Sequence, residues 1–464
     1  MSFIDRFVSS LKEKDEDSVS VPFLCRTIII LIIVGIAARL IIGFFMTHIY
    51  DMYHWGVVIQ NINSGNGLYE LTGYFYTPPW GYLLGLEAFF QDILGVTVIG
   101  EHLTAAFAME NIAWYYTSTV TAPGFNMSLK LMMLVSDLVV GYLIFWIIRD
   151  LTKDKRKAVL GFALWFLCPF VIASGSVIGM FDTISVLMTL LAVVLLRKDR
   201  YIESGVMLSL ATLMKFFPGF FIFIFIAYIL SKNKQDGTAN KKLMMFLIGV
   251  AVTAFIIFLP QLLDGTIADS FLFITSRLNE GVGLDSGVGA VAGYAAILVY
   301  ILAIAVSIMF ALRIKRNDDK EKNDALLFDA LLITTAVMFL YPPLPQYVLL
   351  LFPFVIFAMM HLDKRYRIPC ILIMIGTSIG ALAGGPTDLV AVAAYTGLLN
   401  LDTVMGIIQG YTDPFLGSSP LMLIGLIGFA IQYVGILAVM WVRFGERIKG
   451  TIFKKAKKED AAKQ

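Results

Sequence analysis

Residues 27–46 read TIIILIIVGIAARLIIGFFM, a run of twenty residues in which Arg39 is the single charged side chain. A predominantly apolar run of this length is what a helix needs to cross a bilayer. A second run of this kind, residues 421–442, stands near the C-terminal end and contains no charged residue. The sequence therefore predicts an all-α protein, a polytopic bundle of transmembrane helices.

The composition of the whole chain supports this prediction. Of its 464 residues, 58% are hydrophobic and only 15% are charged, whereas soluble domains carry roughly a quarter charged residues. An ordinary soluble enzyme is therefore excluded. Lys+Arg 36 against Asp+Glu 34 gives a net charge of +2, so no bulk charge indicates a nucleic-acid partner. The three cysteines lie in or beside apolar runs, which favours packing over disulfides.

Apolar runs separated by charged clusters predict about twelve membrane spans. With twelve spans, every cluster of Lys and Arg falls on one side, which the positive-inside rule makes cytoplasmic. We therefore expect a multi-pass protein of the cell membrane with both termini in the cytoplasm. The predicted ranges are 24–46, 128–148, 158–174, 182–197, 203–217, 218–230, 243–260, 290–312, 325–341, 346–361, 368–384 and 420–442.

The spans divide the chain into four parts. Residues 1–23 form a cytoplasmic segment, 24–384 the main transmembrane module, 385–442 an external segment with the last span, and 443–464 a basic cytoplasmic tail. The main module contains a large external loop, residues 47–127. An apolar stretch within this loop, residues 79–90, is short and carries Glu87, so we expect a juxtamembrane or re-entrant helix there.

A few basic residues do not follow the topology pattern. A charge at membrane depth costs at least ~2.5 to 3.5 kcal/mol on insertion scales, so such residues need a partner or a ligand. For Lys215, between two apolar runs, the alternatives are contact with a ligand, snorkelling to the external headgroups, or an ion pair with Asp137 or Asp182. The exceptions are four of the 36 basic residues: Arg39, Lys130, Lys215 and Arg277.

The segment HIYDMYHW, residues 48–55, follows directly after the first span. An interfacial aromatic belt accounts for its Tyr and Trp residues, but it does not account for Asp51. A carboxylate at this place is positioned to take a proton from a sugar hydroxyl as a general base. His48, Asp51 and His54 would share one helical face, which suggests a divalent metal as an alternative. Since no second carboxylate completes such a site, we predict no metal and no other cofactor.

Further stretches, in order over residues 51–353, resemble the GT-C superfamily of polytopic glycosyltransferases, and most closely the GPI mannosyltransferase I catalytic-subunit family and its prokaryotic relatives. Two positions depart from the family pattern, because Tyr53 replaces a second aspartate and Cys168 replaces an asparagine. The matching stretches are 74–78 (YFYTP), 129–148 with Ser136-Asp137-Leu138, 165–169 (WFLCP), 179–183 (GMFDT), 214–218 (MKFFP) and 345–347 (PQY).

The resemblance implies a GT-C-like catalytic module in residues 24–384 that transfers a hexose, namely mannose, from a polyprenyl-phosphate sugar. The acceptor would be a hydroxyl of a glycolipid, glycan or protein on the external face, and the transfer would be inverting with Asp51 as the base. Cations aimed at the leaving phosphate lower the barrier, and Lys215 and Arg277 are the candidates. Further candidates for sugar or headgroup contact, each of which could instead be structural, are Tyr76, Asp182, Gln346, Tyr347 and His54.

Two other classes of protein compete with this interpretation. A secondary transporter often has about twelve spans with cytoplasmic termini, but it predicts an internal repeat, and the two halves show none. A lipid flippase or a scaffold subunit would leave Asp51 without a catalytic role.

Overall fold

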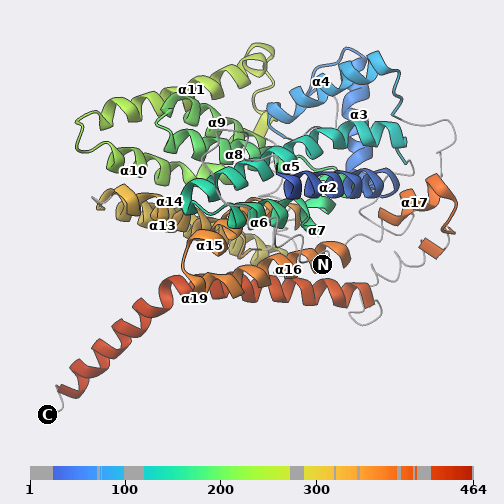
Figure 1. Ribbon diagram of the computed structural model, residues 1–464. Helices are drawn as coiled ribbons and strands as arrows, with labels where there is room; N and C mark the ends of the chain where they lie inside the picture. The colour runs from blue at the N-terminus through green and yellow to red at the C-terminus, as the bar shows by residue number, and fades with distance from the viewer. Residues whose placement is uncertain are drawn as a thin grey trace.

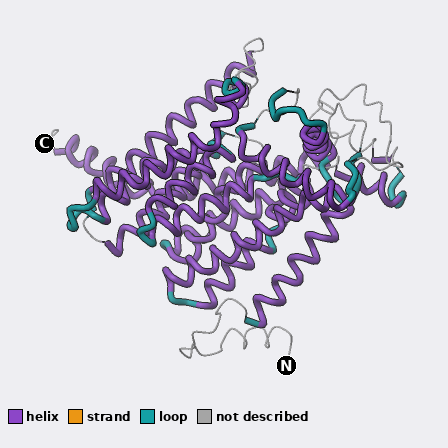
Figure 2. The backbone as a smooth tube through the Cα atoms, turned by 90° about the horizontal axis from the view of Figure 1, so that it is seen from above, coloured by secondary structure: helices purple, strands orange, loops and turns teal. Residues whose placement is uncertain are grey.

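The structure is a computed structural model that describes residues 25–70, 74, 76–98, 120–271, 287–317, 320–341, 345–383, 388–400, 403–404 and 420–461. Every regular element within these ranges is a helix, as Figures 1 and 2 show. The predicted all-α fold is therefore confirmed for this part of the chain.

Each predicted span overlaps one helix or two to three consecutive short helices. The elements of the first half are α2 (Arg26–Phe45), α3 (Ile49–Asn63), α4 (Pro78–Leu94), α5 (Pro123–Thr152), α6 (Lys155–Phe166), α7 (Pro169–Ile172), η1 (Ala173–Ile178), α8 (Asp182–Arg197), α9 (Tyr201–Met214), η2 (Phe217–Phe221) and α10 (Ile222–Lys232). Those of the second half are α11 (Ala239–Asp264), η3 (Asp269–Phe271), α13 (Gly287–Lys315), α14 (Lys320–Met338), η4 (Pro345–Leu351), α15 (Phe352–His361), η5 (Lys364–Tyr366), α16 (Arg367–Ala383), α17 (Leu389–Thr396) and α19 (Pro420–Ala461).

Fewer helices than predicted meet the length and hydropathy of a full membrane span. In the described residues five do so: α2, α5, α11, Tyr294–Lys315 of α13 and Leu423–Gly445 of α19. A sixth is added if α6 and α7–η1, which are bent by 46° at Pro169, count as one broken span. Several helices are thus long and apolar enough to cross a membrane, but the count of twelve is not confirmed.

The long helices run side by side, and two pairs touch backbone to backbone (Figures 1 and 2). A Cβ atom on Gly428 of α19 would lie 2.5 Å from the backbone nitrogen of Gly380 in α16. Likewise, a Cβ on Gly205 of α9 would overlap the carbonyl oxygen of Phe246 in α11. Glycines without side chains permit this close approach of helices.

Buried cations inside the bundle are satisfied by groups of neighbouring helices. The Arg39 Nε donates to Asp137 Oδ2 at 2.9 Å, and Arg39 Nη1 donates to the carbonyl of Phe166 at 2.7 Å. The Lys130 Nζ donates to the carbonyls of Gly43 and Met46 at the C-terminal end of α2, where a cation is favourable. Two of the four exceptional basic residues therefore hold α2 against α5.

Two helices occur in the described part of the loop of residues 47–127, which is predicted to be external. α3 begins shortly after α2 ends and runs across the direction of the bundle (Figure 1). α4 begins at Pro78 and Pro79, which suit the first turn because it has no N–H partner to lose. One face of α4 is buried and the other exposes Leu86, Phe89, Phe90 and Ile93. An exposed apolar face of this kind is typical of a helix that lies on a membrane surface, and the juxtamembrane position of α4 stays a prediction.

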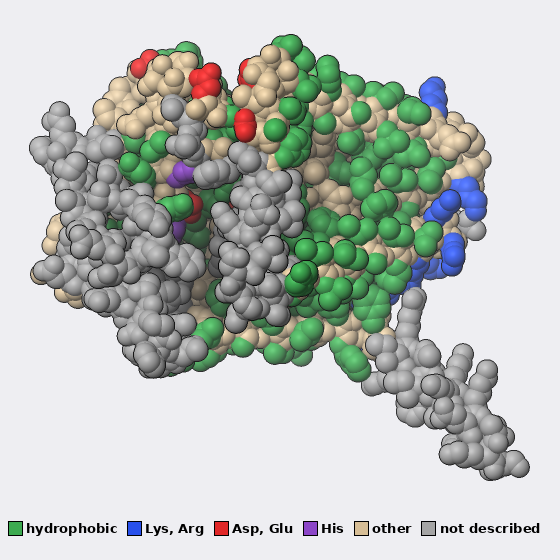
Figure 3. Space-filling view, turned by 180° about the vertical axis from the view of Figure 1, so that it is seen from behind, with side chains coloured by type: hydrophobic (Ala, Val, Ile, Leu, Met, Phe, Trp, Pro, Cys, Tyr) green, Lys and Arg blue, Asp and Glu red, His purple; other side chains and the backbone are tan. Residues whose placement is uncertain are grey.

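Charges separate toward the two ends of the bundle. On the face that Figure 3 shows, Lys and Arg side chains gather at one end, whereas Asp, Glu and His side chains lie toward the other. The end with Lys and Arg is the one that the positive-inside rule predicts to be cytoplasmic. α3 lies at the opposite end (Figure 1).

Candidate functional site

Asp51 lies in the first turn of α3, where the positive end of the helix dipole favours a carboxylate. The start of α3 is fixed by the backbone N–H of His48, which donates to the carbonyl of Val177 in η1 at 3.0 Å. Gly179 follows η1 with φ +72°, and a Cβ there would overlap the Met52 Sδ atom. This glycine therefore allows α3 to pack closely on the break between η1 and α8.

His48 stands between two carboxylates. Its Nδ1 lies 3.0 Å from Asp388 Oδ1, and its Nε2 lies 3.8 Å from Asp51 Oδ2. Asp388 precedes α17, so the segment that begins at residue 385 reaches the site formed by the loop of residues 47–127. Ile49 packs in one apolar cluster with Val390 and Ala391, which holds the two segments together.

The protonation of this group follows from burial and charge. Burial lowers the pKa of His48, but the hydrogen bond to Asp388 and the charges of both carboxylates outweigh this effect and raise the pKa to about 9. Burial raises the pKa of Asp51, and the charges of His48 and Lys215 oppose that rise. At neutral pH the imidazolium of His48 therefore lies beside a carboxylate that is more basic than an ordinary aspartate.

Lys215 lies at the end of α9, where the chain is extended before η2 begins. Its Nζ is 3.4 Å from Asp182 Oδ2, in the first turn of α8, and both side chains are buried. Of the predicted alternatives, an ion pair with Asp182 is present, while Asp137 pairs with Arg39. The positive charge of Lys215 also acts on Asp51, because it lowers the pKa of that carboxylate. Lys215 thus belongs to the same electrostatic group as Asp51.

Aromatic rings surround Lys215. Its Nζ lies 4.2 Å from the ring centre of Phe181, 4.6 Å from that of Tyr347 and 5.1 Å from that of Tyr76. Electron-rich ring faces attract a desolvated cation, and such contacts contribute about 2 kcal/mol. The ammonium group is therefore held in one place by carboxylate and rings together.

Two tryptophans support the rings from α3 and α4. Trp80 stacks on Phe181 with 4.6 Å between ring centres, and Trp55 meets Trp80 edge to face at 5.4 Å. Both indole groups are completely buried. Tyr76 and Trp80 belong to the segment YFYTPPWGY. They therefore connect Trp55 of α3 with the rings around Lys215.

The remaining predicted residues have different surroundings. Gln346 is buried next to Tyr347 at the start of η4. His54 packs against Trp55 at 5.0 Å between ring centres, and burial lowers its pKa to about 4. Arg277 lies outside the described residues, as do residues 99–119 of the external loop. No group of three or more His, Cys, Asp or Glu that could hold a metal occurs in the described ranges.

Two contributors to the site were not predicted from the sequence. In the sequence, Asp388 is an acid in a segment that lacks Lys and Arg. Nothing in the neighbouring residues indicates that it contacts His48, which lies 340 residues away. Phe181 stands inside the stretch GMFDT, and its contact with the Lys215 ammonium depends on the meeting of α8 and α9.

The comparison with protein families supplies the activity class. Residues 113–343 match the family model of glycosyltransferase family 87. The match covers just under half of the chain and contains Asp182 and Lys215, whereas Asp51 precedes it and Tyr347 follows it. It indicates a membrane glycosyltransferase, which favours this class over a transporter or flippase. The more specific GPI mannosyltransferase I family is not shown. A search of curated proteins found no match.

Proposed function

We propose that this protein transfers a hexose, namely mannose, from a polyprenyl-phosphate sugar donor to an acceptor hydroxyl on the external face of the membrane. The match to a glycosyltransferase family supports the group transfer, and the apolar helices support a lipid-linked donor. One observation carries the proposal: Asp51 lies beside the His48 imidazolium and in the same electrostatic group as the Lys215 ammonium.

In the proposed reaction Asp51 accepts the proton of the acceptor hydroxyl, whose oxygen then attacks the anomeric carbon of the donor. The bond from this carbon to the phosphate oxygen breaks, and polyprenyl phosphate leaves with the electron pair. Because attack occurs opposite the leaving group, the anomeric configuration inverts. The raised pKa of Asp51 suits it to this role, since a general base is most effective when its pKa approaches the working pH.

The leaving phosphate develops negative charge, and a fixed cation nearby stabilises it more than the ground state. Lys215 is proposed for this role, with Asp182 and the rings of Tyr76 and Tyr347 as the groups that position it. Arg277 is proposed as a second cation. Gln346 of η4 and His54 of α3 are proposed to contact the sugar or the headgroup.

A direct test uses the purified full chain in lipid vesicles, with a polyprenyl-phosphate mannose donor and a panel of glycolipid, glycan and peptide acceptors. We expect mannose transfer with inverted configuration at the anomeric carbon, measured by NMR of the product. Transfer from a nucleotide sugar but not from the lipid donor would contradict the proposed donor. A product with retained configuration would contradict the proposed mechanism.

A further inference from the structure

A cavity of about 510 Å³ lies at the basic end of the bundle, between α13, α14, η5 and the middle of α19. This is the end opposite α3 (Figure 1), the helix that carries Asp51. Five cationic and two anionic side chains line it: Arg313, Arg316, Lys322, Arg365, Arg443, Asp329 and Asp363. The lining therefore has an excess of positive charge.

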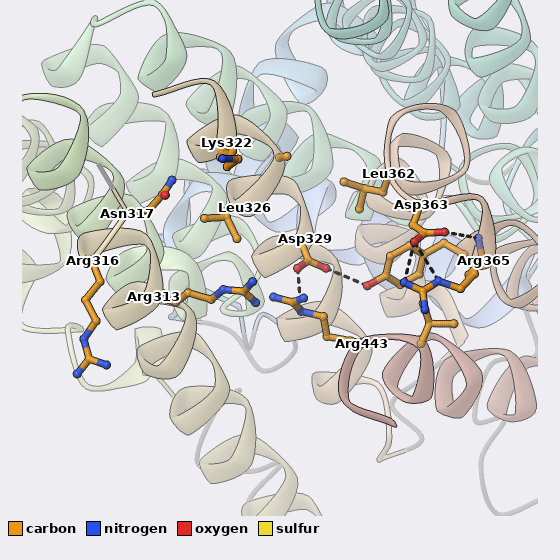
Figure 4. A pocket seen from close by; sticks show the side chains of 13 residues that line it. Arg313, Arg316, Asn317, Lys322, Leu326, Asp329, Leu362, Asp363, Arg365 and Arg443 are labelled. Atoms are coloured by element: carbon orange, nitrogen blue, oxygen red, sulfur yellow. Dashed lines mark hydrogen bonds and ion pairs between the residues drawn. The ribbon is translucent and has the colours of Figure 1, made fainter. Parts of the chain in front are cut away.

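The two carboxylates are already engaged. Asp329 accepts from Arg443 Nε at 2.8 Å and from the Tyr366 hydroxyl at 3.0 Å. Asp363 lies 2.8 Å from Arg365 Nη2. Figure 4 shows the Arg313 guanidinium pointing toward Asp329 and Arg443, while Arg316 extends to the outer side of the cavity. Two guanidinium groups thus converge near a single carboxylate.

Arg313 and Arg316 differ from other cations at this end. Arg197 is paired with both Asp150 and Asp324 at 2.8 Å, and Lys232 lies 2.8 Å from Asp199. Arg313 and Arg316 form no ion pair with any residue in the described part of the chain. Their charges are available to an anion that enters the cavity.

An apolar groove continues from the cavity. A second cavity of about 470 Å³ shares Arg313, Arg316 and Arg443 with the first. Its other lining residues are apolar and belong to α13 and α19: Ala305, Ile308, Met309, Leu312 and Phe444. The same three arginines therefore line both the positively charged cavity and the apolar groove next to it.

We propose that these two cavities bind one anionic membrane lipid. Its phosphate headgroup lies in the cavity of Arg313 and Arg443, and an acyl chain lies in the groove between α13 and α19. Guanidinium groups bind phosphate oxygens in pairs of parallel hydrogen bonds. Basic pockets between transmembrane helices on the cytoplasmic side are known to hold anionic headgroups, and the volumes are those of small-molecule sites. The apolar groove favours a lipid over a soluble anion.

The test measures lipid retention rather than sugar transfer, so it is independent of the proposed activity. The purified full chain is exchanged into detergent with phosphatidylglycerol or phosphatidylcholine of the same acyl chains, and bound lipid is counted by native mass spectrometry. We expect retention of phosphatidylglycerol only. The double variant Arg313→Met, Arg316→Met should bind it roughly 30-fold more weakly, since two cations near the surface are lost.

Arg367 provides a matched control, because it is an exposed arginine at the same end that lines neither cavity. Arg367→Met should retain the lipid as the wild type does. If the double variant fails to fold, Ala325→Glu takes its place in the test. This substitution adds a carboxylate to the lining without removing the partner of any residue, and it should also abolish retention of phosphatidylglycerol.

Equal retention of the two lipids by the wild type would overturn the proposal, and so would wild-type retention of phosphatidylglycerol by the folded double variant or by folded Ala325→Glu. A soluble-anion arm uses glycerol phosphate, which carries the headgroup chemistry without acyl chains. If glycerol phosphate raises the unfolding temperature as much as phosphatidylglycerol does, the site binds a soluble anion and the lipid assignment is wrong.

Discussion

At the residue scale, variants of the ion pair between Lys215 and Asp182 distinguish a structural role of Lys215 from a catalytic one. The sequence left both partners of Lys215 open, because spacing along the chain does not say which of two aspartates meets it. The structure gives Asp182, and the burial of both side chains makes the pair costly to break.

Lys215→Met should therefore destabilise the protein by ~3–5 kcal/mol, since it leaves the charge of Asp182 buried without its partner. The double variant Lys215→Met, Asp182→Asn should regain most of this stability but not the transfer activity. Thermal unfolding and initial rates of both variants check the prediction. Recovery of normal transfer in the double variant would show that Lys215 only balances Asp182.

His48 should control the protonation of Asp51. His48→Gln removes one of the two cations that oppose the effect of burial on Asp51, so the pKa of Asp51 should rise further. The acid limb of the pH profile of kcat/KM should then move to higher pH. If the acid limb of a folded His48→Gln variant stays at the same pH, that limb is not set by the pKa of Asp51.

The stability of the same variant provides a control with a defined sign. His48 has a pKa of about 9 in the folded protein against its ordinary value of 6.5, so its proton stabilises the fold. This contribution, up to about 3 kcal/mol, is complete below pH 6.5 and is lost as pH rises through 9. The part of the difference in unfolding temperature between wild type and His48→Gln that comes from this proton should accordingly vanish above pH 9.

At the element scale, the sequence predicted where helices occur but not where they break. Apolar runs are evident from composition, so each predicted span overlaps helical residues. The bend of 46° between α6 and α7 and the extended residue Lys215 between α9 and η2 depend on Pro169 and Pro218 and on tertiary contacts. A proline permits a break without dictating its direction. The site is built at such breaks, which explains why its geometry was not predictable.

The contact of α16 with α19 depends on glycine. Gly428→Ala would place a methyl group 2.5 Å from the Gly380 nitrogen and force the helices apart, at a cost of about 1–3 kcal/mol. Gly85→Ala is the control, because a Cβ on this α4 glycine meets nothing within 4 Å. We expect a lower unfolding temperature for the first variant and an unchanged or higher one for the second. Equal unfolding temperatures would contradict the described packing.

At the scale of the whole molecule, the separation of charges predicts which end faces the cytoplasm. Ser64, after α3, and Gln235, after α10, are exposed at the two ends. In a chain whose three cysteines are replaced by alanine, Ser64→Cys should react with a membrane-impermeant maleimide in intact cells. Gln235→Cys should react only after permeabilisation. The reverse pattern would invert the topology and place Asp51 in the cytoplasm.

The sequence did not predict which distant segments come together in the folded chain. Asp388 and His48 come together only because α17 packs on the start of α3. Composition and charge placement sufficed for the fold class and for Asp51 as a candidate. Contacts across 340 residues require the folded chain.

The central claim is that Asp51 is the general base of sugar transfer, and Asp51→Asn tests it most directly. The amide has nearly the same shape but is not a base, so the rate of transfer from a polyprenyl-phosphate sugar should fall by about 10²–10⁴-fold with little change in unfolding temperature. Asp92→Asn, which alters an exposed carboxylate of α4, should transfer normally. Near-normal transfer by folded Asp51→Asn would contradict the account.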